Sequence, residues 1–110
     1  MELLLAIFAG GSLLLSGFSI PMIRNKVPPN LFYGVRIPRT FADEAVWYAV
    51  NRFAGKRLLI VGLVSAALAI GLYFIPGITI DSYAWIFSGV FLVLFAIVVI
   101  QIWNFIKRLP

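Results

Sequence analysis

The stretch that decides the fold is residues 24–57, which read RNKVPPNLFYGVRIPRTFADEAVWYAVNRFAGKR. This stretch carries seven of the nine Lys and Arg residues, and it separates two long runs that contain no charged side chain. Almost all of the remaining sequence is compatible with hydrocarbon. Any specific activity of the protein is therefore expected to reside in this segment.

The composition indicates that the solvent of this chain is a lipid bilayer. Hydrophobic residues make up 63% of the sequence and the mean hydropathy is +1.06, whereas soluble domains are about half apolar. The basic residues gather at the ends of the apolar runs, which is typical of membrane orientation and contact with anionic lipid, not of nucleic-acid binding. The chain has no Cys and no His, so the commonest general base and metal and haem ligands are missing. We expect no enzymatic activity, no cofactor and no metal.

Three uncharged runs are long enough to cross a bilayer, because a membrane helix needs roughly 20 residues to span about 30 Å of hydrocarbon. The first run follows the acidic Glu2, and its length together with that charge argues against a cleaved signal peptide. A Pro-Gly turn signal ends the second run, and two basic residues end the third. The predicted spans are residues 3–23, 58–75 and 83–106.

The distribution of charge predicts the orientation of these spans. Lys and Arg collect on the cytoplasmic side of membrane proteins. They lie here in the loop 24–57 and at the C-terminus, and three spans place those two segments on the same side. Both are predicted to be cytoplasmic, with the N-terminus outside. No charged residue lies within a predicted span, which argues against a pump or an ion-coupled transporter.

The loop itself divides into two parts. Residues 27–39 should not be helical, because three prolines and a glycine interrupt them. Thr40 is a suitable N-cap for a helix over residues 41–54, and Gly55 is a suitable end. At about 14 residues this helix is too short to cross, so it is predicted to lie in the membrane interface. The expected fold is an all-α membrane protein, one domain over residues 1–110, with three transmembrane helices and a short interfacial helix in the cytoplasmic loop.

Arg36 is the basic residue that lipid anchoring explains least well. It sits between Gly34 and Pro38 in a stiff segment, and its guanidinium suits bidentate binding of a phosphate or a carboxylate. Anchoring to anionic lipid is the alternative. Composition leaves both interpretations open.

The other polar and aromatic side chains of the loop favour structural roles. Asn30 and Asn51 are expected to act as hydrogen-bond latches between loop and helix, since buried polar groups at membrane depth need partners. Trp47 and Tyr48 are more typical of interface anchors than of residues that stack on a ligand. The carboxylate before Glu44 suits the positive start of a helix, and the two carboxylates diverge too far to form an acid–base pair. A binding role for Glu44 stays open.

Two spaced motifs in the loop carry a resemblance. They read Asn30-x-x-x-Gly34-x-Arg36-x-Pro38-x-Thr40, followed by Trp47-x-x-x-Asn51-Arg52-x-x-Gly55. Together they resemble the signature segment of the SdpI family (SdpI/YfhL-like) of small bacterial membrane proteins. The resemblance covers about 26 residues and their two flanking spans. It implies that these residues form one binding unit, in which Arg36 points inward and pairs with Glu44, with a carboxylate of a partner or with a lipid phosphate.

The resemblance also implies a place and a role for the protein. The expected location is the bacterial cytoplasmic membrane. The expected function is non-enzymatic, namely immunity against a secreted membrane-active peptide toxin, membrane signalling through a cytoplasmic regulator, or both. The expected partners are the lipid bilayer, a peptide toxin and that regulator.

Two other functions compete with this one. The chain is also suited to be a small accessory subunit of a larger membrane protein complex, because its spans contain small residues that let another helix approach closely. An enzyme that acts on lipid headgroups is disfavoured by the missing His and Cys and by the lack of converging carboxylates.

Overall fold

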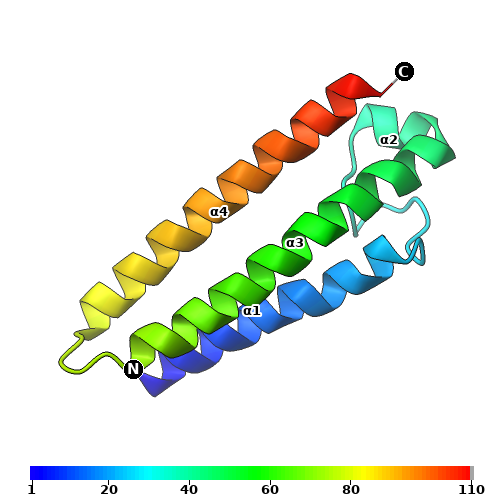
Figure 1. Ribbon diagram of the computed structural model, residues 1–110. Coiled ribbons are helices and arrows are strands. Elements are labelled where there is room, and N and C mark those ends of the chain that lie inside the picture. The colour runs from blue at the N-terminus through cyan, green and yellow to red at the C-terminus, as the bar shows by residue number, and fades with distance from the viewer. Residues whose placement is uncertain (110) are drawn as a thin grey trace.

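A computed structural model describes residues 1–109 and is helical, with no strand in that range. Three of its helices are long and apolar enough to cross a membrane, and a short helix lies between the first two long ones. The predicted fold class is thereby confirmed. In Figure 1 the helices are α1 (Glu2–Ile23), α2 (Pro38–Ala42), α3 (Glu44–Tyr73) and α4 (Ile80–Arg108).

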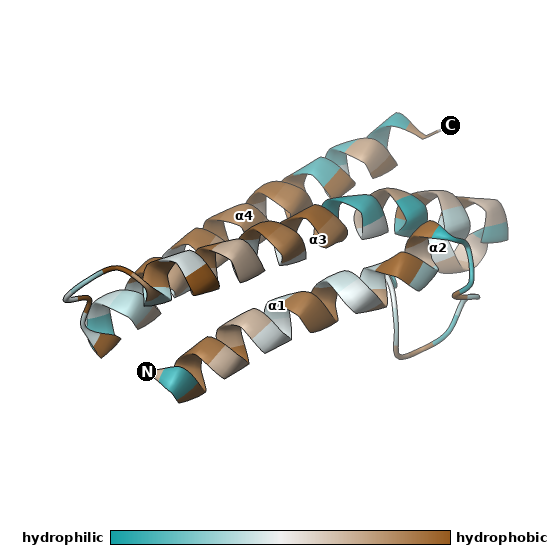
Figure 2. Ribbon diagram, turned by 60° about the horizontal axis from the view of Figure 1, so that its bottom comes forward, coloured by the Kyte–Doolittle hydropathy of each residue, from teal (hydrophilic) through white to brown (hydrophobic). Residues whose placement is uncertain are grey.

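The three long helices form an elongated bundle in which α3 runs antiparallel to α1 and α4 (Figure 1). The N-terminus lies beside the turn between α3 and α4, whereas α2 and the C-terminus lie at the opposite end. We call the latter the loop end. The prediction that the long loop and the C-terminus share one side is confirmed. Figure 2 shows that hydrophilic residues gather at the loop end of α3 and of α4, while the middle of these two helices is hydrophobic.

Small residues bring α1 and α3 into close contact. A Cβ atom added to Gly62 of α3 would lie 2.6 Å from the carbonyl oxygen of Ser12 in α1 and would also overlap Ser16. The hydroxyl of Ser16 donates a hydrogen bond of 3.0 Å to the carbonyl of Leu59 in α3. Lipid supplies no hydrophobic force between helices, so close packing and such bonds hold them together.

Helix α4 is attached to the other helices mainly through aromatic side chains. The hydroxyl of Tyr83, which is fully buried, donates to the carbonyl of Ala69 in α3 over 2.8 Å. Near the loop end the rings of Phe105 and Phe53 stack with their centroids 4.3 Å apart. Only 11% of the most apolar 18-residue segment of α4 is buried within the protein, compared with 39% of the corresponding segment of α3. Most of α4 is therefore left to face lipid or a ligand.

The predicted interfacial helix over residues 41–54 is wrong in its limits. The short helix is α2, which begins at Pro38, a residue suited to the first helical position. Asp43 then caps α3 by accepting from the amide of Ala45 over 2.9 Å, and α3 continues through Gly55. This glycine ends no helix, because it is the point where α1 approaches: an added Cβ would lie 2.9 Å from the carbonyl oxygen of Ser19.

Because most of the segment predicted as a separate helix belongs to α3, this helix is longer than a bilayer requires. Its 30 residues extend over about 45 Å, compared with about 30 Å of hydrocarbon. The extra length carries the basic Arg52, Lys56 and Arg57, all exposed. The predicted second span, residues 58–75, corresponds to the remainder of α3, which ends at Tyr73. The loop is thus built on a rigid helical stem.

Replacement of Gly62 by Leu should separate α1 from α3. The new side chain would meet the Ser12 carbonyl, a backbone atom that cannot swing aside. We expect the free energy of unfolding, measured by SDS titration in detergent, to fall by about 1–3 kcal/mol or more. Gly71→Leu in the same helix is the matched control, because nothing lies within 4 Å of a Cβ at that position. Equal stability of the two variants would contradict this packing.

Candidate functional site

The loop between α1 and α2 has a rigid tip organised by Asn30. The side-chain oxygen of Asn30 accepts from the amides of Phe32 and Tyr33, over 2.8 and 2.7 Å. Its side-chain nitrogen donates to the carbonyls of Pro28 and Tyr33, over 2.8 and 3.0 Å. All four hydrogen bonds stay within the loop. Asn30 therefore shapes the loop, and the prediction that it joins the loop to a helix is wrong. The turn leaves Leu31 and Phe32 exposed at the tip, by 73% and 89%.

Asn51 joins this loop to α3, as predicted. Its side chain is 1% exposed. The oxygen accepts from the amide of Val35, and the nitrogen donates to the carbonyl of Trp47 over 2.9 Å. Gly34 lies directly against this amide: its φ is +106°, and an added Cβ would lie 2.6 Å from the Asn51 oxygen. Glycine is required here both for its backbone conformation and for the missing side chain.

Trp47 forms the core beneath the loop. It is fully buried and packs with Met22, Val27 and Ala54. Its indole nitrogen donates to the carbonyl of Val27 over 2.8 Å. The prediction that Trp47 anchors the protein in the interface is therefore wrong. An indole with one N–H donor can sit in an apolar core when a backbone carbonyl accepts that hydrogen.

Thr40 and Arg39 fix the segment around α2. The Thr40 hydroxyl is buried, accepts from the amide of Ile37 over 3.0 Å and lies 2.9 Å from the carbonyl oxygen of Val35. It thus stabilises the start of α2 from inside that helix and does not cap a helix that begins at residue 41. Arg39 donates to the carbonyl of Leu109 over 3.0 Å. The loop is in this way connected to the end of α4.

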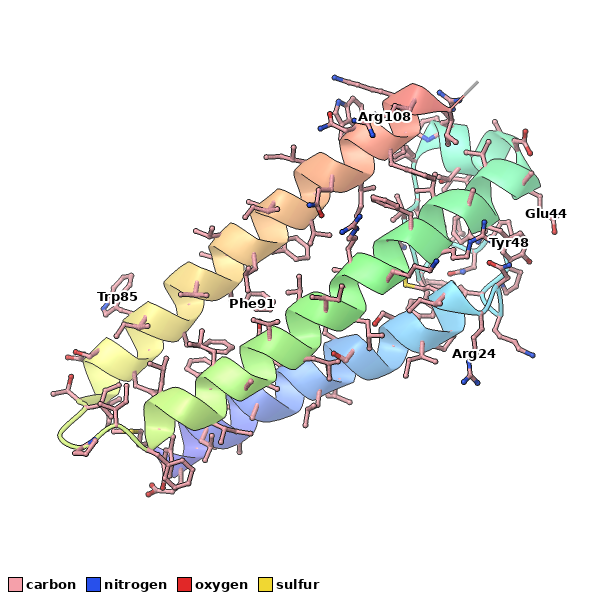
Figure 3. All side chains as sticks on the ribbon, in the orientation of Figure 1. Arg24, Glu44, Tyr48, Trp85, Phe91 and Arg108 are labelled. Carbon is pink, nitrogen blue, oxygen red and sulfur yellow. The ribbon has the colours of Figure 1, made fainter. Side chains whose placement is uncertain are left out.

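The charged residues of the motif lie on the outside. Arg36 is exposed and donates to the carbonyl of Leu31, so the predicted inward orientation is wrong. Within residues 1–109 it forms no ion pair with Glu44, which is exposed at the start of α3 and points away from α4 (Figure 3). Arg52 is exposed on α3 as well. The motif therefore divides into a buried clamp and an exposed basic surface.

The clamp closes one end of an apolar cavity of about 480 Å³. The loop contributes Tyr33, Gly34, Val35 and Ile37, so the segment held by Asn51 is a wall of the cavity. The opposite walls come from α1 between Leu15 and Met22 and from α4 between Phe95 and Ile106. A single residue of α3, Leu58, completes the lining. We call this space the loop-end cavity.

A second hollow lies farther from the loop, also between α1 and α4. Its volume is about 280 Å³, and it is lined by Ile7, Phe8, Gly11, Ser12, Phe87 and Phe91. Stacking of Phe8 on Phe87, with centroids 4.2 Å apart, joins the two helices beside it. We call this space the distal hollow. Both spaces follow from the way α4 leans on α3 and leaves its side toward α1 incompletely packed.

Tyr33 carries the unusual polar group of the loop-end cavity. Its hydroxyl is buried and has no hydrogen-bond partner among the described residues. Burial raises the pKa of this phenol above its usual value. The ring stands edge-on to Phe18 of α1, with the centroids 6.0 Å apart. The site can therefore bind an apolar group, and the buried Tyr33 hydroxyl beside it lacks an acceptor in the described part of the chain.

Several residues of this site were not predicted from the sequence. They are Val27, Tyr33 and Val35 of the loop and the cavity wall of α4. Val27 and Val35 act through backbone atoms, which no side-chain pattern can indicate. The wall of α4 is about 60 residues away in sequence and is a uniform apolar run. Tyr33 was detectable only as a neighbour of Gly34.

Comparison with known proteins finds a family that matches most of the chain. The SdpI/YfhL protein family matches residues 26–106. The immunity protein SdpI of Bacillus subtilis (strain 168) is 33% identical over 69 residues, which cover 63% of this chain and 31% of that protein. The chain thus matches less than a third of the length of this curated relative. No solved structure is significantly similar to the chain.

Replacement of Asn51 by Leu should release the loop from α3. The variant keeps the approximate size of the side chain but removes the acceptor of the Val35 amide. Leaving a buried group unpaired costs about 1–3 kcal/mol, so hydrogen exchange at the Val35 amide should accelerate by tenfold or more. Asn104→Leu on the exposed side of α4 is the control. An unchanged exchange rate at Val35 would show that Asn51 does not hold the loop.

Proposed function

Because the chain belongs to the SdpI/YfhL protein family, we propose that it is a non-enzymatic immunity protein of the membrane, which binds a secreted membrane-active peptide between its helices. The proposal is supported by the similarity to a relative that is named as an immunity protein. That relative is much longer, so its function is carried to this chain as a hypothesis. The proposed location is the bacterial cytoplasmic membrane, with the N-terminus outside and the loop end inside.

The distal hollow is the observation that carries this proposal. In the proposed topology it lies in the outer half of the bilayer, where a secreted peptide arrives first. Its walls are apolar and aromatic, with the small Gly11 between them. An apolar helix can approach closely at a glycine, and aromatic rings offer large contact areas. A peptide held there is kept from associating with other copies in the membrane.

Protection from killing tests the proposal. A Bacillus subtilis strain that lacks its own SdpI would express this chain and be grown in spent medium of its parent strain. We expect survival to rise at least tenfold over the empty vector. Unchanged killing, with the protein present in the membrane by immunoblot, would overturn the proposed function.

A pair of glycine variants tests the place of binding. Gly11→Trp fills the distal hollow, whereas Gly89→Trp adds the same side chain on the exposed side of α4; neither position has an atom within 4 Å of an added Cβ. We expect Gly11→Trp to abolish most of the protection and Gly89→Trp to retain it. Equal protection by both variants would place the peptide elsewhere.

Signalling is the second element of the proposal, and the loop tip supports it. Leu31 and Phe32 are held outward by Asn30, and Arg36 lies beside them with its guanidinium on the Leu31 carbonyl. An exposed apolar pair next to a cation is typical of a protein-binding surface. We propose that this tip contacts a cytoplasmic regulator.

Photo-crosslinking in cells tests the loop tip. A photoreactive phenylalanine analogue at position 32 should yield an adduct with a soluble protein. The same analogue at Phe74, which is 73% exposed next to the α3–α4 turn, should yield adducts with lipid only. Lipid adducts alone at both positions would show that the tip is a membrane anchor.

A further inference from the structure

The loop-end cavity is lined mostly by apolar side chains, and its two lining residues with hydroxyl groups are Ser19 of α1 and Tyr33 of the loop. Its apolar part follows α4 from Phe95, in the middle of the helix, to Ile106 near its end. The buried, unpartnered hydroxyl of Tyr33 belongs to the loop that closes the cavity. Buried hydroxyls in native proteins nearly always have partners, so this one indicates a ligand that brings a hydrogen-bond acceptor.

Two basic side chains lie near the same end of the cavity. The ammonium of Lys107 lies 5.6 Å from the ring centroid of Trp103, which lines the cavity. Arg39 donates to the carbonyl of Leu109, three residues beyond the lining residue Ile106. The side-chain carboxylates nearest to Arg39 in sequence, those of Asp43 and Glu44, are exposed at the start of α3. Figure 3 shows Glu44 pointing away from the end of α4 that carries Arg108.

From the middle of the bilayer to its surface, there follow the apolar wall of the cavity, the unpaired hydroxyl of its lining residue Tyr33 and the basic side chains beyond it. A phospholipid presents a hydrocarbon chain, an ester carbonyl and a phosphate in the same order. We propose that the loop-end cavity binds one anionic phospholipid from the surrounding bilayer. Its acyl chain lies against α4, an ester carbonyl accepts from the Tyr33 hydroxyl, and its headgroup lies near Lys107.

A lipid fits this cavity better than a peptide segment does. An extended peptide segment brings backbone N–H groups, each of which needs an acceptor when it leaves water, and the apolar wall of α4 offers none. A phospholipid has acceptors at its ester and phosphate and needs only donors, which Tyr33 and Lys107 supply. This proposal does not rest on the proposed immunity function, which concerns the distal hollow.

Native mass spectrometry of the full-length protein tests the proposal. The protein, released from detergent, is titrated with phosphatidylglycerol or with phosphatidylcholine that has the same acyl chains. We expect one phosphatidylglycerol per chain to be retained, at least tenfold more tightly than phosphatidylcholine. Equal retention of the two lipids, or retention of neither, would overturn the proposal. So would a second protein copy that replaces the lipid.

Three substitutions and one control variant separate the parts of the site. Tyr33→Phe removes an unpaired hydroxyl, so it should not lower thermal stability, yet it should weaken retention of phosphatidylglycerol about fivefold. Lys107→Gln should remove most of the preference for the anionic lipid. Val99→Trp fills the cavity from an exposed position of α4 and should abolish retention, whereas Val90→Trp, outside the lining, should not. Wild-type retention by Tyr33→Phe or by Val99→Trp would show that the lipid binds elsewhere.

Discussion

One amide side chain, that of Asn51, holds the loop end of this protein together. Its oxygen accepts a hydrogen bond from a loop amide, and its nitrogen donates one to a helix carbonyl. No apolar residue of the same shape can therefore replace it. Gly34 lies against that amide at a positive φ, and the segment from Tyr33 to Ile37 becomes a wall of the loop-end cavity. Polar groups near hydrocarbon must be satisfied within the protein, and here their satisfaction shapes one wall of the loop-end cavity.

The need for close contacts and hydrogen bonds between helices in lipid also explains why α4 is the most weakly attached helix. Helices α1 and α3 are joined by close backbone contact at Gly55 and Gly62 and by the Ser16 hydroxyl. The glycine of α4 makes no such contact, because a Cβ added to Gly89 would meet no atom within 4 Å. Helix α4 is attached by the Tyr83 hydroxyl and by stacked rings, and its side toward α1 retains two hollows. Surfaces of this kind suit ligands that come from the bilayer.

Individual residues show how far the loop could be predicted. The sequence predicts that Asn51 joins the loop to the helix, because a polar side chain beside an apolar run has to be paired. This argument holds without knowing which group is the partner. Trp47 was misread, since aromatic residues near a span usually sit at headgroup level, and only its contact with the Val27 carbonyl reveals a core position. Gly55 was misread as a helix end because the approach of Ser19 from α1 is not visible in local sequence.

The sequence by itself determined that the chain is an all-helical membrane protein with three long apolar helices, that the loop and the C-terminus share one end, and that the loop motif belongs to a known family. These properties follow from run length, from the positions of Lys and Arg and from the spacing of a few residues, all of which are local or additive. Only the tertiary structure decided that the motif is a clamp, that Arg36 faces outward, and that Tyr33 and α4 line one cavity. Those features depend on contacts between segments far apart in the chain, and uniform apolar helices carry no pattern that indicates which of their sides meet.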